Sequence, residues 1–342
     1  MFDTHSVLDT LYAGNSLSQT QAFGLFNSIM HGEQSPAIIA AVLTALKIKH
    51  ESPQEIAGAA SAMVSNALPF PTPAYPFADI VGTGGDGHNT INISSSAGVV
   101  AAACGVKVAK HGNRSVSSRS GSADLFQQFG IQLEISAETA RHCLDDANFC
   151  FLYAPVYHAG MRHAAPVRAE LKTRTLFNIL GPLANPASPT HGVFGVYSPE
   201  LLEPYAQTLM LLGQHRALIV HGNGLDELAL HGESHIFDLE HGDIRRYTVT
   251  PEDFGLPEYP LSAIEGGAPD ANRAMIEAAL GGQGEEAHRA AIAMNCGALL
   301  KVTGTVDTFK QGAEMAMASM AAGEPLNVLN KVAQLSQEKP HD

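Results

Sequence analysis

The most informative shortage in this sequence is that of positive charge. Its 342 residues include 20 lysines and arginines against 34 aspartates and glutamates, which gives a formal net charge of −14. General nucleic-acid binders and membrane-surface proteins need basic surface, so we expect neither kind of partner. A chain this acidic that binds a phosphorylated ligand must hold it with local donors and a metal ion, because its overall field repels anions.

Cysteine is also scarce, and long apolar runs are missing. The four cysteines contain no C-x-x-C pair, so their spacing fits neither a zinc site nor a disulfide framework. The longest apolar stretch, around residues 97–105, is about half of what a bilayer span needs. The N-terminus has no basic segment followed by an apolar core, so we expect no signal peptide. These shortages predict a soluble, cytoplasmic protein with reduced thiols.

The composition otherwise provides for a large core. Hydrophobic residues make up 45% of the sequence and charged residues 16%, in a chain whose length suggests two domains. Up to about residue 68 the pattern is helical: residues 19–30 show helical spacing, and Ser-Pro pairs at 35–36 and 52–53 open two further helices. Four prolines then fall within residues 69–76, which excludes helix and sheet and marks a domain boundary.

From residue 79 onward short apolar runs alternate with helical patterns, as in a mostly parallel sheet covered by helices. We predict strands at 79–81, 106–109, 131–133, 149–154, 193–196 and 217–221, and helices at 94–104, 122–129, 137–145, 199–212 and 161–180, with long helices over 272–337. The predicted fold class is α/β. A small all-helical domain comprises residues 1–72 with 165–190 returning to it, and a large domain comprises 73–164 and 191–342.

A predicted strand runs into a glycine-rich turn, Gly82-Thr-Gly-Gly-Asp86, and then into a hydroxyl-rich helix start at residues 92–96. Glycines let the backbone approach a ligand and adopt positive φ. The N–H groups of such a turn and of the next helix point at an anion. Tight packing or a helix cap would explain either segment alone, but both on one strand–turn–helix unit favour a phosphate site.

A second candidate segment, Lys110–Ser118, places two cations, an amide and three hydroxyls directly after another predicted strand. The alternative is a solvated polar loop. Lysine serves phosphate as a point charge, however, while Asn and Ser side chains are directed donors. The segment therefore favours a second phosphate-binding loop.

Two carboxylates, Asp226 and Glu227, lie on a turn after the last predicted strand. Acidic pairs on turns are usually only solvated. Hard oxygen ligands suit Mg²⁺, which typically uses one or two carboxylates together with substrate phosphates. In an acidic protein that binds phosphate, we therefore favour a metal site.

A guanidinium, that of Arg168 in Pro166-Val-Arg168, could fork onto a substrate carboxylate, although an interdomain salt bridge is an equally good explanation. His158 lies upstream and is a weak candidate for general acid–base chemistry, because the chain contains 16 histidines.

Together these segments resemble the anthranilate phosphoribosyltransferase family, over nearly the whole chain. The resemblance is carried by 82–86, 92–95, 110–114 with 117–118, 120–124, 166–168, 174–186 and 224–227. It implies a nucleoside-phosphorylase-like fold, Mg²⁺, a homodimer through the helical domain, and transfer of phosphoribose from PRPP to anthranilate in tryptophan biosynthesis. One departure is Ala159-Gly160-Met161-Arg162, where the family commonly has Pro-Ala-Met-Lys, which weakens any specific role for His158.

The resemblance also implies three groups of site residues. PRPP would contact Gly82, Gly85, Asp86, Thr90, Asn92, Ile93, Ser94, Ser95, Lys110, His111, Gly112, Asn113, Arg114, Ser115, Val116, Ser117, Ser118 and Ser122. Anthranilate would contact Gly82, Asn113 and Arg168, and the metal ligands would be Ser94, Asp226 and Glu227.

The chemistry expected of such a site is positioning and electrostatics. The aniline amine is uncharged, so no obligatory protein base is needed, and expelling diphosphate is the harder task. Two alternatives stay open: a pyrimidine nucleoside phosphorylase, which would not need the acidic pair, and a non-catalytic nucleic-acid-binding relative, which would need a basic groove.

Overall fold

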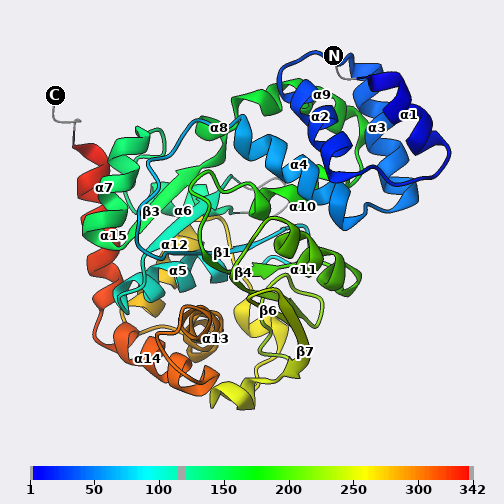
Figure 1. The fold of residues 1–342 in the computed structure, drawn as a ribbon. Coiled ribbons are helices and arrows are strands. Elements are labelled where there is room, and N and C mark those ends of the chain that lie inside the picture. Colours follow the sequence, from blue (N-terminus) through cyan, green and yellow to red (C-terminus); the bar gives the residue numbers. More distant parts are fainter. Residues whose placement is uncertain (1–2, 115–119, 339–342) are drawn as a thin grey trace.

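The computed structural model describes residues 3–114 and 120–338 (Figure 1). The chain begins with α1 (Thr4–Tyr12), α2 (Gln19–Met30), α3 (Pro36–Lys49) and α4 (Pro53–Ser65). Each starts after a residue whose side chain accepts a hydrogen bond from a first-turn N–H: Asp3, Ser18, Ser35 and Ser52. The prediction of a helical N-terminal region is confirmed.

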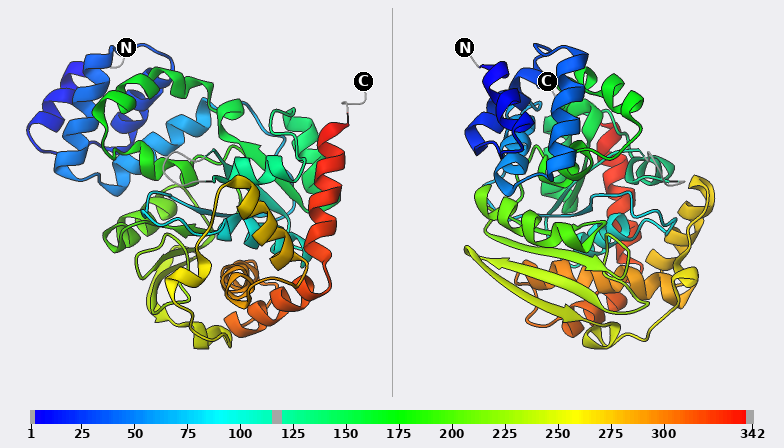
Figure 2. Two further views of the ribbon diagram at one scale, coloured as in Figure 1. Left: turned by 180° about the vertical axis from the view of Figure 1, so that it is seen from behind. Right: turned by 90° about the vertical axis from the view of Figure 1, so that its right-hand side faces the viewer.

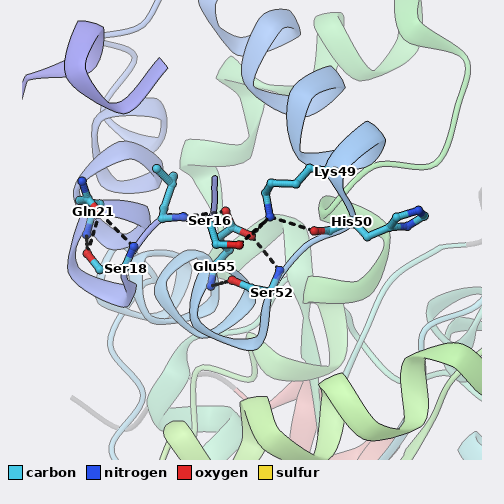
Figure 3. A network of polar contacts seen from close by, with 8 residues as sticks. Ser16, Ser18, Gln21, Lys49, His50, Ser52 and Glu55 are labelled. Carbon is cyan, nitrogen blue, oxygen red and sulfur yellow. Dashed lines mark hydrogen bonds and ion pairs between the residues drawn. The ribbon is translucent and has the colours of Figure 1, made fainter. Parts of the chain in front are cut away.

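A buried ion pair fixes these helices to one another (Figure 3). Lys49 Nζ, at the end of α3, lies 2.7 Å from Oε2 of Glu55 in the first turn of α4. The Glu55 carboxylate also accepts the backbone N–H groups of Leu17 and Ser52, and Lys49 donates to the Ser16 hydroxyl. One charged pair therefore joins the segment before α2, the end of α3 and the start of α4.

Residues 66–77 contain neither helix nor strand, as the proline density predicts. A seven-stranded sheet follows in the described part of the chain, in the order β3-β2-β1-β4-β5-β6-β7. Its strands are β1 (Ala78–Gly82), β2 (Val108–Gly112), β3 (Phe149–Tyr153), β4 (His191–Gly195), β5 (Arg216–Gly222), β6 (Ser234–Glu240) and β7 (Asp243–Val249). The first five are parallel and the last two antiparallel, so the prediction of a mostly parallel sheet is confirmed.

The remaining helices are α5 (Ile93–Ala103), α6 (Ser122–Gln128), α7 (Ala137–Ala147), α8 (Ala154–Tyr157), α9 (Ala165–Leu171), α10 (Phe177–Leu180), α11 (Leu202–Leu211), α12 (Pro269–Leu280), α13 (Glu286–Val302), α14 (Phe309–Ala321) and α15 (Glu324–Gln337). Figures 1 and 2 show α1–α4 at one end of the molecule and α13 and α14 at the other, with the sheet between them.

Alternate side chains of the central strands face two different cores. Val193 and Leu218 pack in the core that contains the buried residues of α5 and α13. Phe194 and Ile219 pack in the core shared by α11 and the N-terminal helices. A strand directs successive side chains to opposite faces, so one sheet serves both cores. The helical domain is thus joined to the large domain through a common apolar core.

Several details of the sequence-based prediction are wrong. Residues 131–133 form no strand: Ile131 and Leu133 are buried, but the Gln132 N–H donates to the Ser336 hydroxyl instead of to a neighbouring strand. The strand expected at 106–109 is β2, two residues later. The antiparallel pair β6 and β7 was not predicted, although the turn between them, His241-Gly242 with φ of 49° and 92°, is a hairpin signal.

Residues 161–180 do not form one helix. A 3₁₀ segment (Ala159–His163) precedes α9, and α9 ends at Lys172, whose φ of 48° is left-handed. Pro166 lies in the first turn of α9, where a proline is tolerated because its missing N–H would have no intrahelical partner there. Helix α9 contacts α3, and α10 contacts α4. These contacts support our proposal that residues 165–190 return to the helical domain.

Candidate active site

Three of the predicted segments, residues 82–86, the start of α5 and the acidic turn at 226–227, meet at the carboxyl ends of the parallel strands. Strands β1 and β4 are neighbours in the sheet, while β2 lies on the other side of β1, so the chain order reverses between β1 and β4. Ligands of open parallel sheets bind at such a reversal, outside the carboxyl ends. The turns after β1 and β5 converge there, together with the start of α5.

The glycine-rich turn after β1 contains two glycines in the left-handed region, Gly84 at φ 70° and Gly85 at φ 78°. The N–H of Gly84 donates to Asp226 Oδ2 at 2.6 Å, and the carbonyl of Gly85 accepts from the guanidinium of Arg174. Asp86 turns its carboxylate back onto the N–H of His88 at 3.1 Å. Because positions 82, 84 and 85 are glycines, this turn exposes backbone groups instead of side chains at three of its five positions.

Asp226 lies in close contact with two glycines, Gly82 at the end of β1 and Gly195 at the end of β4. A Cβ at Gly82 would lie 2.1 Å from Asp226 Oδ2, and one at Gly195 would lie 1.6 Å from the Asp226 carbonyl oxygen. Real Cβ atoms do not come so close to other atoms. The acidic turn therefore fits against the ends of β1 and β4 only because positions 82 and 195 are glycine.

The start of α5 lies against the second carboxylate. The N–H of Ser94 donates to Glu227 Oε1 at 3.1 Å. Asn92, the N-cap, does not cap the helix with its side chain: it donates to the Ser120 carbonyl at 3.0 Å and accepts from Asn272 at 2.6 Å. The remaining predicted residues of this segment differ in exposure: Thr90 is half-buried and pairs with Glu265, whereas Ile93 and Ser95 are buried.

Burial and mutual repulsion raise the pKa values of the acidic pair, Asp226 and Glu227. Loss of hydration raises the pKa of Asp226, and the neighbouring charge of Asp86 raises it further. Loss of hydration followed by the charge of Asp226 likewise raises the pKa of Glu227. Crowded carboxylates of this kind are stabilised as anions by a cation. Within 3–114 and 120–338 no cluster of three or more His, Cys, Asp or Glu side chains could hold a metal alone, so any ion here needs ligand oxygens as well.

Lys110 is placed differently from the sequence-based expectation. It lies within β2, only 2% exposed, and its Nζ donates to the Ile80 carbonyl at 2.5 Å. Burial lowers its pKa, while the charges of Asp79, Glu227 and Asp226 raise it. Its ammonium thus lies beneath the acidic turn, where it offsets part of the negative charge.

The end of β2 and the loop after it are partly described. His111 is buried, and Gly112 is half-buried with Ser122 Oγ 2.3 Å from where a Cβ would stand. Asn113 is exposed, and its backbone carbonyl accepts from the Ser122 hydroxyl at 3.2 Å. Arg114 lies 2.7 Å from Asp124. Four predicted residues lie outside the described part: Ser115, Val116, Ser117 and Ser118.

Two further predicted functional groups are Arg168 and His158. The Arg168 guanidinium stands over the ring of Phe177, 5.3 Å from its centroid, and burial lowers its pKa. His158 is buried, with Nε2 2.8 Å from the Ala184 carbonyl oxygen. Its ring meets that of His111 edge-on at 5.1 Å. Burial lowers the pKa of His158.

Sequence reasoning missed the supporting residues of this site. Asn185 donates to Asp79 Oδ2 and to the Ala109 carbonyl, both at 2.8 Å, and so links β1 to β2. Asn272 holds Asn92, and Arg174 holds Gly85. No local pattern marks Asn272, which is distant in sequence, whereas Arg174 and Asn185 lie within the segment 174–186 that already stood out.

Two family models match the chain. One, described as "Glycosyl transferase family, helical bundle domain", matches residues 5–67. The other, "Glycosyl transferase family, a/b domain", matches residues 74–326 and therefore most of the sequence. Among the described residues no helix is long and apolar enough to cross a membrane.

Individual relatives agree with the family models. Anthranilate phosphoribosyltransferase of Tolumonas auensis is 56% identical over 97% of this chain and 99% of its own length. The crystal structure of the Thermus thermophilus enzyme of the same name superposes with a TM-score of 0.92 at 42% identity, covering 97% of this chain and 99% of that one. The Saccharomyces cerevisiae enzyme in complex with PRPP and Mg gives a TM-score of 0.89 at 30% identity, covering 97% of both chains.

Proposed function

This chain belongs to the anthranilate phosphoribosyltransferase family, and we propose that it transfers the 5-phosphoribosyl group of PRPP to the amine of anthranilate. The products are N-(5-phosphoribosyl)anthranilate and diphosphate, in tryptophan biosynthesis. The C1–oxygen bond to diphosphate breaks, a C1–nitrogen bond forms, and the amine loses one proton.

One observation carries this proposal: the candidate phosphate segments and the candidate metal ligands interlock. Gly84 of the glycine-rich turn bonds to Asp226, and Ser94 at the start of α5 bonds to Glu227. Backbone N–H groups and carboxylates thus share one small region at the ends of β1 and β5. A diphosphate that is accompanied by a divalent cation needs both kinds of group together.

The donor set suits Mg²⁺. Asp226 and Glu227 are hard oxygen ligands whose charge Lys110 offsets only in part, and Ser94 adds a hydroxyl beside them. When bound, Mg²⁺ would stabilise the negative charge that grows on the departing diphosphate. In the Saccharomyces cerevisiae enzyme named above, Mg accompanies PRPP.

The protein itself contributes orientation and charge. We assign PRPP to a set of residues whose donors hold the diphosphate: Gly82, Gly85, Asp86, Thr90, Asn92, Ile93, Ser94, Ser95, Lys110–Ser118 and Ser122. The amine of anthranilate would be held near C1 by contacts of Gly82, Asn113 and Arg168. No side chain is assigned as an obligatory base. Nε2 of His158 lies 2.8 Å from the Ala184 carbonyl oxygen, so this ring nitrogen is already engaged with the backbone, which supports that assignment.

The direct test mixes the purified protein with PRPP, Mg²⁺ and anthranilate and follows the loss of anthranilate fluorescence. We expect a loss that depends on both PRPP and Mg²⁺. A protein that instead cleaves pyrimidine nucleosides with inorganic phosphate would be the phosphorylase, and retention on heparin at moderate salt would support the nucleic-acid-binding alternative. Either result without anthranilate consumption contradicts the proposal.

A homodimer through the N-terminal helices is part of the proposal. Two large apolar side chains stand exposed there: Tyr12 at the end of α1 is 63% exposed, and Ile48 near the end of α3 is 75% exposed. Neither packs into the shared core, so each is available to a second copy of the chain.

We further propose that the protein works in the cytoplasm. Its cysteines, Cys104, Cys143, Cys150 and Cys296, are all free thiols. Free thiols persist in a reducing compartment. Fractionation of cells, with activity recovered in the cytosolic extract, tests this location.

A further inference from the structure

Arg174 touches the glycine-rich turn from outside the groups assigned to substrate. It lies between α9 and α10, and its guanidinium donates to the carbonyl of Gly85. The same guanidinium is stacked on the ring of Tyr197, 4.1 Å from the centroid. An arginine can do both at once because its fork donates in the plane while its face packs on an aromatic ring.

Tyr197 is itself tied to the same turn. Its N–H donates to the Thr83 hydroxyl at 3.1 Å, and the N–H of Thr83 donates to the Gly195 carbonyl at 2.9 Å. The ring on which Arg174 stacks therefore follows directly from the end of β4 and is linked to the end of β1. This gives the guanidinium a fixed platform beside Gly85.

The backbone of Arg174 is held in turn by the helical domain. Lys47 Nζ, on α3, donates to the Thr173 hydroxyl at 2.5 Å and to the Arg174 carbonyl at 3.0 Å. A continuous chain of contacts thus runs from α3, through residues 173–174, to the turn that approaches the diphosphate.

We propose that Arg174 is a positioning residue that orders the glycine-rich turn for PRPP, and that Lys47 transmits the position of the helical domain to it. The inference rests on the proposed function. Left-handed glycines at 84 and 85 make the turn conformationally free, so an external restraint is needed to hold its N–H groups in place. Asp226 restrains the turn at the Gly84 N–H, and Arg174 restrains it at the next residue's carbonyl.

The test is steady-state kinetics of Arg174→Gln with both substrates varied. Loss of one hydrogen bond and one cation–π contact predicts a rise of about tenfold in KM for PRPP. KM for anthranilate and the melting temperature should change little. Arg162→Gln is the matched control, since Arg162 is exposed on the preceding 3₁₀ segment and should leave both KM values unchanged.

Conservative variants separate positioning from simple attraction of an anion. Arg174→Lys keeps the charge but loses the fork and the flat face, so it should resemble Arg174→Gln. Tyr197→Phe should behave as wild type, whereas Tyr197→Leu should raise KM for PRPP and add little to Arg174→Gln in the double variant. Full rescue by Arg174→Lys, or an effect on anthranilate alone, would overturn the inference.

Lys47→Met provides a second, remote variant. Lys47 is exposed and lies on α3, so we expect a rise of only about two- to threefold in KM for PRPP. Calorimetric titration with PRPP and Mg²⁺ distinguishes failure of the proposed function from failure of the positioning role of Arg174. If the wild type neither binds PRPP nor consumes anthranilate, the proposed function is wrong. If the wild type is active and Arg174→Gln equals it, only this inference is wrong.

Discussion

At the scale of single residues, the site depends on charged groups placed where few neutralising partners reach them. Asp226 and Glu227 accept hydrogen bonds from backbone N–H groups. The described cation near them, Lys110, donates its ammonium hydrogen bond to the carbonyl of Ile80. Such groups are stable only with further positive charge. This arrangement of side chains therefore supports the proposed divalent ion.

The first residue-scale prediction concerns that ion. In Asp226→Asn with Glu227→Gln the hard anionic ligands are lost, so the Mg²⁺ concentration for half-maximal activity should rise by more than about 100-fold. The measurement is activity against Mg²⁺ at saturating PRPP. Glu285→Gln with Glu286→Gln, an exposed adjacent pair at the start of α13, is the matched control. An unaltered titration would remove the acidic turn from the site.

The second residue-scale prediction concerns Arg168. Arg168→Ala should raise KM for anthranilate by about 10- to 100-fold, the range expected for losing charge-assisted hydrogen bonds, with PRPP binding nearly unchanged. Arg168→Lys keeps the charge but loses the forked guanidinium, so its KM for anthranilate should lie between those of the wild type and Arg168→Ala. Kinetics with each substrate varied in turn decide the matter, and a defect confined to PRPP would refute the role.

At the scale of elements, two close approaches set the geometry of the site, and the glycine at the end of β4 is the tighter. Gly195→Ala would force a Cβ against the Asp226 carbonyl and displace the acidic turn. We expect kcat/KM to fall about 100-fold, because displacements near 1 Å have effects of that size. Gly181→Ala, where nothing lies within 4 Å of a new Cβ, should retain activity. Equal activity in both variants would contradict this reading.

The ion pair between α3 and α4 sets the stability of the N-terminal helices. Lys49→Met leaves the buried Glu55 carboxylate without its cation and should lower the free energy of unfolding by about 3 kcal/mol. Urea denaturation followed by circular dichroism measures the loss. Lys47→Met, on the same helix but exposed, should lower it by no more than about 1 kcal/mol. Similar midpoints for the two variants would show that burial of the pair is unimportant.

The sequence predicts elements best where local chemistry is sufficient. Helical spacing for α2, Ser-Pro starts for α3 and α4, and apolar runs for β1, β3, β4 and β5 place these elements within a few residues. It fails where tertiary contacts decide. Ile131 and Leu133 alternate as in a strand but face a core without a pairing partner, and Lys172 ends α9 in a conformation that its residue type does not announce.

The same distinction applies to the site. The motif segments of residues 82–86, 92–95 and 226–227 come together as expected, because the carboxyl ends of parallel strands share one edge. The residues that hold these segments in place could not be predicted from the local sequence. Lys110 is visible as a cation, but its burial under the acidic turn depends on the register of β2. The partnership of Asn272 with Asn92 joins residues that are 180 positions apart.

At the scale of the whole molecule, the exposed apolar side chains of α1 and α3 predict self-association. Ile48→Glu would place a charge in the proposed interface and should raise the dimer dissociation constant by about 100-fold or more, since a two-fold interface contains the residue twice. Sedimentation velocity across a concentration series measures this. Met210→Glu, at a side chain 41% exposed on α11, is the control and should leave the sedimentation unchanged. A monomeric wild type would refute the dimer.

The sharing of one apolar core by the N-terminal helices, α11 and one face of the sheet limits how this molecule can be divided. Phe194 and Ile219 on the strands are covered by that core. Removing residues 1–72 would expose part of an apolar sheet face to water, so we expect such a fragment to aggregate instead of folding. The proline-rich segment marks a boundary in the sequence, but truncating the protein there would not yield an independently stable domain.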